Sequence, residues 1–134
     1  MIDADAGLRI LVVEDEALIT MVIEDVIETL GYQIVGPVAQ VDDAMVVAAT
    51  GDFDCALLDI NVLGGTTYAI AELLIERGCP FVMATGYSDW SMPKHLVAEK
   101  RLTKPYSSMA LELELRLLEA QVQLKRLTSR RVGG

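Results

Sequence analysis

Short apolar runs alternate with segments of helical periodicity along the chain, and this alternation restricts the fold more than any other feature. The first run, residues 9–13, is apolar after its first residue and is followed by three acids, which is typical of a strand buried in a parallel sheet. Apolar residues then recur every three or four positions over residues 16–30, which indicates a helix. The pattern continues and predicts strands at 9–13, 32–39, 54–58, 81–84 and 100–103, with helices at 16–30, 41–50, 66–77, 88–97 and 107–127.

Alternating strands and helices are typical of an α/β fold with a doubly wound parallel sheet. Right-handed crossovers would place helices on both faces of this five-stranded sheet. We expect the fourth helix to be short or irregular, because Trp90, Pro93 and His95 interrupt any apolar period there.

The length of the chain argues for a single domain. Its 134 residues, of which 52% are hydrophobic, suffice for one core. The sequence shows no internal repeat and no segment of low complexity. We expect one domain over residues 8–127, followed by a short basic tail at 128–134.

The charge balance and the cysteines exclude several classes of protein. Acids outnumber bases by 20 to 11, for a net charge of −9, which argues against a nucleic acid partner. The chain opens without a signal peptide pattern, and no apolar stretch is long enough to span a membrane. Cys55 and Cys79 are too few for a disulfide framework and are expected to be buried thiols in a reducing compartment. These observations predict a cytoplasmic protein with no membrane partner.

Polar side chains follow four of the five predicted strands. They are Glu14 and Asp15 after the first strand, Asp59 after the third, Thr85 after the fourth and Lys104 after the fifth. The carboxyl ends of parallel strands share one edge of the sheet, so these side chains should converge. Three carboxylates repel one another unless a cation lies among them, and oxygen ligands without His or Cys favour Mg²⁺. A carboxylate can also be a nucleophile in aspartyl phosphate chemistry, with threonine and lysine holding the phosphoryl oxygens.

Four separated segments resemble the motifs of bacterial two-component response-regulator receiver domains. They are Val12-Val13-Glu14-Asp15-Glu16, Leu57-Leu58-Asp59, Ala84-Thr85-Gly86 and Thr103-Lys104-Pro105. The segments occur in the order seen in that family, and the resemblance extends over roughly residues 8–127. It implies a CheY-like, flavodoxin-like sheet with the strand order 2-1-3-4-5.

The resemblance implies a role for each catalytic candidate. Asp59 would be the phosphoacceptor, while Thr85 and Lys104 would bind the phosphoryl group and signal its presence. A cis peptide bond would join Lys104 to Pro105. The donor would be a sensor histidine kinase or a histidine phosphotransferase. The chain would then be a signalling phosphoacceptor and no enzyme, beyond self-catalysed phosphotransfer and autodephosphorylation.

The resemblance also implies a set of metal ligands. Asp15, Asp59 and the main-chain carbonyl of Asn61 would bind Mg²⁺ directly. Glu14 would act on the ion through a water molecule.

Some positions depart from the pattern of the family. The aromatic switch residue that often stands three positions before the lysine is replaced here by Arg101. We hypothesise that Tyr87, two positions after Thr85, takes over the aromatic role. Residues 83–88 also resemble the FAT-GUY subgroup of receivers, with methionine in place of the first phenylalanine and serine in place of the second aromatic residue. We expect switching near residues 85–97 to involve an order–disorder change.

The last predicted helix is apolar on two opposite faces. At about 100° per residue, one face carries Leu111, Leu115, Leu118 and Val122, and the other carries Leu113, Leu117, Ala120, Leu124 and Leu127. A helix that packs on a sheet needs one apolar face, and an exposed second face usually marks an interface. We predict a contact with a partner or a second copy through Leu113, Leu117 and Leu124. The alternative is that this face packs against the fourth helix or the end of the chain.

These features together predict a stand-alone receiver whose output is a contact with a downstream protein. The same site would serve a phosphate sink that drains a kinase, or a receiver-like interaction module that is never phosphorylated. A phosphohydrolase with an aspartate nucleophile is a further alternative, but it would need a second aspartate where Asn61 stands. A nucleotide-binding flavodoxin-like protein would need a glycine-rich loop in place of the acids at residues 14–16.

Overall fold

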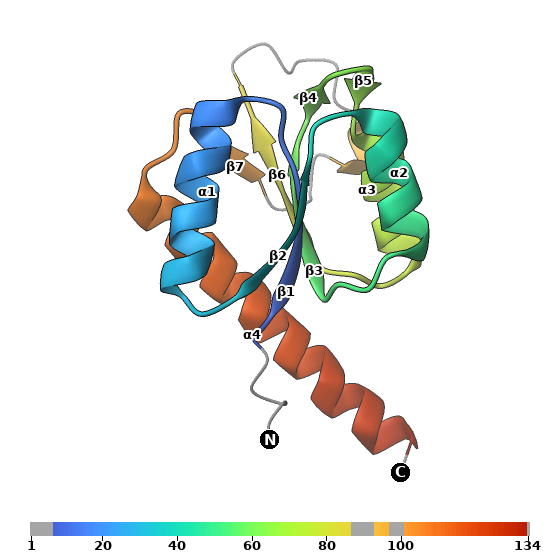
Figure 1. Cartoon of the computed structure of the whole chain (residues 1–134). Helices are drawn as coiled ribbons and strands as arrows, with labels where there is room; N and C mark the ends of the chain where they lie inside the picture. The colour runs from blue at the N-terminus through green and yellow to red at the C-terminus, as the bar shows by residue number, and fades with distance from the viewer. Residues whose placement is uncertain (1–6, 87–92, 97–100, 134) are drawn as a thin grey trace.

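The computed structural model describes residues 7–86, 93–96 and 101–133. Five parallel strands form one sheet in the order β2-β1-β3-β6-β7 (Figure 1). The strands are β1 (Arg9–Val13), β2 (Gln33–Val38), β3 (Cys55–Asp59), β6 (Phe81–Thr85) and β7 (Arg101–Thr103). Counted along the chain, this order is 2-1-3-4-5 and confirms the predicted fold class.

Helices cover both faces of the sheet. They are α1 (Ala17–Thr29), α2 (Val41–Thr50), α3 (Tyr68–Glu76) and α4 (Ser108–Gly133). Helices α1 and α4 lie on one face, and α2 and α3 lie on the other (Figure 1). Alternate strand residues point to opposite faces, so Leu11 and Leu58 join the core beneath α2 and α3, while Ile10 and Leu57 join the core beneath α1 and α4. Both faces are buried, which explains why these strands are continuous apolar runs.

The second strand ends in an irregularity that positions the first acid of the site. The register of β2 against β1 shifts between Val35 and Val38. Gly36 lies in this stretch with a positive φ of 105°, and its bond to Pro37 is cis. A Cβ on this glycine would lie 2.8 Å from the Val38 nitrogen, so a larger residue does not fit. The strand still reaches Val38, whose carbonyl accepts a hydrogen bond of 3.0 Å from the amide of Glu14.

A short hairpin that the sequence pattern did not predict follows β3. Its strands, β4 (Asn61–Val62) and β5 (Gly65–Thr66), pair antiparallel across the segment expected to be a loop. Gly64 and Gly65 both have a positive φ. Glycine adopts this conformation readily because it has no Cβ, so the tight turn forms here. The hairpin sets the path of the chain directly after Asp59.

The segment predicted as the fourth helix is described only in part. It contains one 3-10 turn, η2 (Lys94–Leu96), and Leu96 is buried in the core beneath α2 and α3. This described part is a 3-10 turn, and the length of the whole predicted helix stays a prediction. Residues 88–92 and 97 of the predicted helix lie outside the described residues.

The last helix is longer than predicted. Helix α4 has 26 residues and continues through residues 128–133, which we expected to form a tail. The Ser107 hydroxyl oxygen accepts a hydrogen bond of 3.0 Å from the amide of Ala110 and so caps the start of the helix. In Figure 1 the helix crosses one face of the sheet and projects beyond its edge. The division of the chain at residue 127 stays a prediction.

Two further expectations concern the cysteines and the membrane. Cys55 and Cys79 are buried and free of disulfide bonds. Burial raises the pKa of both thiols, which keeps them protonated and weakly reactive. Among the described helices, none has the length and apolar character that a bilayer crossing requires.

Candidate functional site

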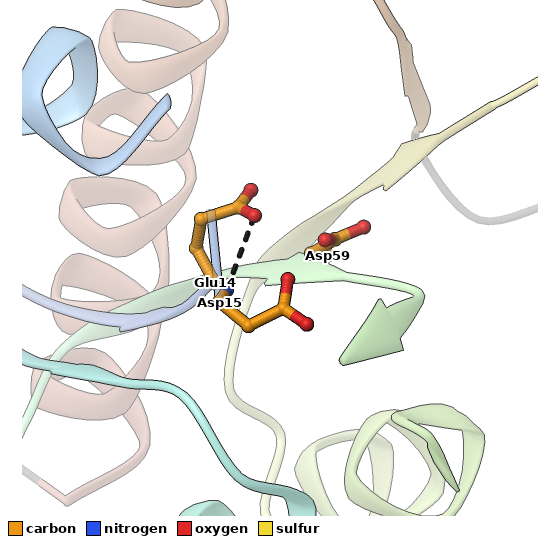
Figure 2. A group of neighbouring side chains, drawn as sticks. All are labelled: Glu14, Asp15 and Asp59. Carbon is orange, nitrogen blue, oxygen red and sulfur yellow. Dashed lines mark hydrogen bonds between the residues drawn. The ribbon is translucent and has the colours of Figure 1, made fainter. Parts of the chain in front are cut away.

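Three acidic side chains gather at the carboxyl edge of the sheet (Figure 2). Glu14 and Asp15 directly follow β1, and Asp59 is the last residue of β3. Strands β1 and β3 are neighbours, with Val13 opposite Leu58, so the sheet places Glu14 beside Asp59. One oxygen from each carboxylate lies within 4.8 Å of the other two. The structure therefore brings together the three acids that the sequence placed at the ends of two strands.

The carboxylate of Glu14 is held in one orientation by its neighbours. Its Oε2 atom accepts hydrogen bonds of 3.1 Å from the amides of Asp15 and Glu16. Its Oε1 atom lies 3.3 Å from Lys104 Nζ. The side chain is only 2% exposed, and a charge this deeply buried requires such partners.

Lys104 supplies positive charge to the acid cluster. Its Nζ atom lies 3.0 Å from Asp59 Oδ2. Its amide donates a hydrogen bond of 2.7 Å to the carbonyl of Thr85, and its bond to Pro105 is cis, as the family resemblance implied. Burial lowers the pKa of Lys104, but the hydrogen bonds and charges of Asp59 and Glu14 raise it by more. The lysine therefore stays protonated at neutral pH.

The carboxyl group of Asp59 is more easily protonated than an ordinary aspartate. Burial is the largest cause and, with the nearby Glu14 carboxylate, raises the pKa of Asp59 to about 7, although Lys104 acts in the opposite direction. One lysine thus does not fully offset the cluster of acids. Oxygen donors that carry excess negative charge fit a hard divalent cation such as Mg²⁺.

Thr67 is a site residue that the sequence analysis missed. Its buried hydroxyl donates a hydrogen bond of 2.8 Å to the main-chain carbonyl of Asp59. Thr67 directly precedes α3, but its side chain makes no hydrogen bond that caps the helix. A threonine in a polar turn carries no local signal for a contact eight residues earlier.

Thr85 and Asn61 lie at the same edge of the sheet as the acids. In the register of β3 and β6, Ala84 is opposite Asp59, and its carbonyl accepts a hydrogen bond of 3.1 Å from the amide of Ile60. Thr85 follows as the last residue of β6 and is 9% exposed. Asn61 is the exposed first residue of β4, two positions after Asp59.

The structure describes only some of the other predicted switch and interface residues. Tyr87 falls outside the described residues, and Arg101 begins β7, paired with Met83 of β6. The interface candidates are all exposed on α4; they are Leu113, Leu117 and Leu124.

The sheet order and the acids, threonine and lysine at its carboxyl edge are those of a CheY-like receiver. The profile of the response regulator receiver domain matches residues 10–116. The chain belongs to this family of two-component signalling domains, as the motifs in its sequence indicated.

Two curated relatives are transcriptional regulatory proteins. PdtaR of Mycobacterium tuberculosis is 31% identical over 111 residues, which cover 78% of this chain and 54% of PdtaR. DltR of Streptococcus agalactiae is 30% identical over 131 residues, which cover 94% of this chain and 58% of DltR. The chain thus spans little more than half the length of the curated relatives it matches.

Solved receiver structures superpose on most of the chain. SdrG from Sphingomonas melonis is 39% identical with a TM-score of 0.72, over 84% of this chain and 97% of SdrG. The receiver domain of a sensor histidine kinase from Pseudomonas aeruginosa, solved with a magnesium ion in its active site cleft, is 24% identical with a TM-score of 0.72. That match covers 88% of this chain and 99% of the other, and at this identity it shows the shared fold.

Proposed function

We propose that Asp59 accepts a phosphoryl group from a phosphohistidine of a sensor histidine kinase or a histidine phosphotransferase. A carboxylate oxygen of Asp59 attacks phosphorus, and the bond between phosphorus and the donor imidazole breaks, with its electron pair going to the imidazole nitrogen. The product is an acyl phosphate on Asp59. The observation that carries this proposal is the 3.0 Å contact between Asp59 Oδ2 and Lys104 Nζ beside two further carboxylates.

Lys104 and Thr85 are the residues proposed to hold the transferred group. The phosphoryl group carries more negative charge than the carboxylate, so the lysine would pair with a phosphoryl oxygen after transfer. The hydroxyl of Thr85, at the end of β6, can donate a hydrogen bond to a second phosphoryl oxygen. Both residues would thereby report that Asp59 is phosphorylated.

The acid cluster is proposed to hold Mg²⁺. Asp15, Asp59 and the main-chain carbonyl of Asn61 would be direct ligands, and Glu14 would act through a water molecule. Bound Mg²⁺ would offset the charge of the phosphoryl oxygens during transfer. Support comes from the raised pKa of Asp59 and from the likeness to the Pseudomonas aeruginosa receiver that holds a magnesium ion.

An apolar groove beside the site suits the surface of the phosphoryl donor. It has a volume of about 470 Å³, and its lining includes Leu18, Ile19 and Val22 of α1 and Lys104, Pro105 and Tyr106 after β7. Leu18 is 78% exposed. A donor must bring its phosphohistidine to Asp59, so its surface must cover the residues around Lys104. We assign donor binding to this groove.

Phosphorylation is proposed to shift the chain between two conformations, mainly near residues 85–97 and in α4. Tyr87 would serve as the aromatic switch, since Arg101 stands at the usual position. Membership of the FAT-GUY subgroup belongs to this proposal and is supported by the sequence of residues 83–88.

The proposed output is a contact with a downstream protein in the cytoplasm, without binding to nucleic acid or membrane. A separate contact, with a partner or with a second copy of the chain, is assigned to the exposed leucine face of α4. Its members are Leu113, Leu117 and Leu124. The net charge of −9 supports a protein partner over a nucleic acid.

The first experiment is an intact mass measurement after incubation with a small acyl phosphate. We expect one phosphoryl adduct on the unmodified protein in the presence of Mg²⁺, and none with a chelator or with Asp59→Asn. Lack of an adduct under every condition would favour the receiver-like interaction module. Measuring transfer to and from a phosphorylated donor would then separate an output regulator from a phosphate sink.

A further inference from the structure

The exposed face of α4 has the spacing of a heptad repeat. Leu113, Leu117, Ala120, Leu124 and Leu127 follow one another at alternating steps of four and three residues, which are the a and d positions of a coiled coil. The four leucines are 57%, 36%, 65% and 58% exposed in that order. We call these five residues the leucine seam.

The face of α4 opposite the leucine seam packs on the sheet. Its members are Leu111, Leu115, Leu118 and Val122, none more than 4% exposed. At about 100° per residue, the centres of the two faces lie on opposite sides of the helix. Two copies can therefore pair through their leucine seams, because each sheet lies on the side of its own helix that faces away from the partner helix. The two sheets do not collide in this arrangement.

The second half of α4 has little of the domain behind it. Residues 123–128 are all exposed, and the helix projects past the sheet (Figure 1). Among the side chains of this half that the structure describes, Arg126 contacts Asp54 Oδ1 at 2.9 Å and Lys125 donates a hydrogen bond to the carbonyl of Gly78. Helices in proteins derive most of their stability from packing of an apolar face. The projecting turns, with Leu124 exposed, lack that packing within one copy.

The charges along α4 select one orientation for a helix pair. Residues 108–119 contain three acids and one base, whereas residues 120–133 contain four bases and no acid. An antiparallel pair places the acidic half of each helix along the basic half of the other, which is attractive. A parallel pair would place the basic halves side by side.

We propose that two copies of this chain associate through the leucine seam as an antiparallel helix pair. The seam then matches itself around a two-fold axis near Ala120. Leu113 packs against the partner's Leu127, and Leu117 packs against the partner's Leu124. The small side chain of Ala120 allows the two helices to approach closely at the axis. This inference names the partner of the α4 surface and rests on that part of the proposed function, but not on phosphotransfer to Asp59.

Light scattering after size exclusion tests the association. We expect the unmodified protein to have twice the chain mass of 14.6 kDa. The double variant Leu117→Glu with Leu124→Glu should have the mass of one chain. Val46→Glu is the matched control, because Val46 is 63% exposed on α2 and lies off the seam, so it should keep the double mass. Circular dichroism of all three proteins should give the same helical signal, which would establish that the variants are folded. A single-chain mass for the unmodified protein would overturn the proposal.

Cysteine crosslinking tests the orientation. A mixture of Leu113→Cys and Leu127→Cys proteins should form a disulfide between the two variants. Leu113→Cys alone should not crosslink, because the antiparallel pair separates the two copies of residue 113. The unmodified protein, whose own cysteines are buried, gives the background. Crosslinking of Leu113→Cys alone, with no disulfide between the two different variants in the mixture, would show a parallel pair and overturn the antiparallel proposal.

The two proposals fail in different ways. Asp59→Asn should keep the double mass, and the Leu117→Glu with Leu124→Glu variant should still gain one phosphoryl group from the small acyl phosphate. A dimer that is never phosphorylated contradicts only the proposed phosphotransfer. A protein that is phosphorylated but has the mass of one chain in light scattering contradicts only the proposed helix pair.

Discussion

Thr67 Oγ1 donates a hydrogen bond of 2.8 Å to the main-chain carbonyl of Asp59, and both residues are buried. The amide of Thr67 also donates to the carbonyl of Ile60 at 2.9 Å. The chain just before α3 is thus tied to the end of β3. Asp59 is held from two sides, its backbone by Thr67 and its carboxylate by Lys104.

Removing the Thr67 hydroxyl should destabilise the protein. We expect Thr67→Val to lower the free energy of unfolding by about 1–3 kcal/mol, because a buried carbonyl loses a hydrogen bond partner. Thr67→Ser keeps the hydroxyl and should lose less. Urea denaturation of the three proteins measures the difference. Equal losses for the valine and serine variants would show that the hydrogen bond does not stabilise the fold.

The raised pKa of Asp59 predicts that stability falls as pH rises. The carboxyl titrates at about 7 in the folded protein and close to its ordinary value of 3.8 in the unfolded chain. Between these values the folded state binds the extra proton, so the free energy of unfolding decreases with increasing pH and levels off above the folded pKa. Asp59→Asn lacks this dependence.

Thermal midpoints in the presence of a chelator check this prediction. From about pH 5 to about pH 8, Asp59→Asn should become progressively more stable relative to the unmodified protein. A stability difference that does not change with pH would contradict the raised pKa.

Magnesium should stabilise the folded protein through the acid cluster. A ligand that binds only the folded state at 100 times its dissociation constant adds about 2.7 kcal/mol to the free energy of unfolding. Asp15→Asn should reduce the shift in thermal midpoint that Mg²⁺ produces. Asp42→Asn, an exposed acid in the first turn of α2, is the matched control and should leave the shift unchanged. An equal response in both variants would remove Asp15 from the proposed ligand set.

The apolar groove beside the site should affect the rate of phosphorylation only when the phosphoryl donor is a protein. Leu18→Glu places a charge in the apolar groove, so we expect phosphotransfer from a phosphorylated histidine phosphotransferase to slow by about tenfold or more, the equivalent of about 1.4 kcal/mol of binding. Phosphorylation by a small acyl phosphate should keep its rate, because that donor needs no protein surface. Val46→Glu on α2 is the control for both donors. Loss of both reactions in Leu18→Glu would indicate damage to the site itself.

The sequence predicted the features that local pattern determines. Buried parallel strands are apolar runs, and two of these runs, β1 and β3, lead directly to acids at the carboxyl edge of the sheet. The convergence of Glu14, Asp15 and Asp59 therefore followed from the strand assignments. The hydrogen bond of Thr67 to Asp59 depends on the path of the hairpin between them, which no local pattern encodes.

The predicted end of the last helix, near residue 127, was wrong for a different reason. Residues 128–133 are mostly polar and basic, which suggested a tail, but they include arginine, a good helix former, and lack proline. Helix α4 therefore continues through them.

Helix α4 connects the two edges of the sheet. It begins four residues after Lys104, at the edge that holds the acid cluster, and Arg126 near its other end binds Asp54, which precedes β3. Its 26 residues span about 39 Å at 1.5 Å per residue, so a tilt of about 5° at its first turn moves its far end by about 3 Å. Under the proposed phosphotransfer, a change at Asp59 that tilted the first turn of α4 by this angle would displace the far end of the helix by a distance that another protein can detect.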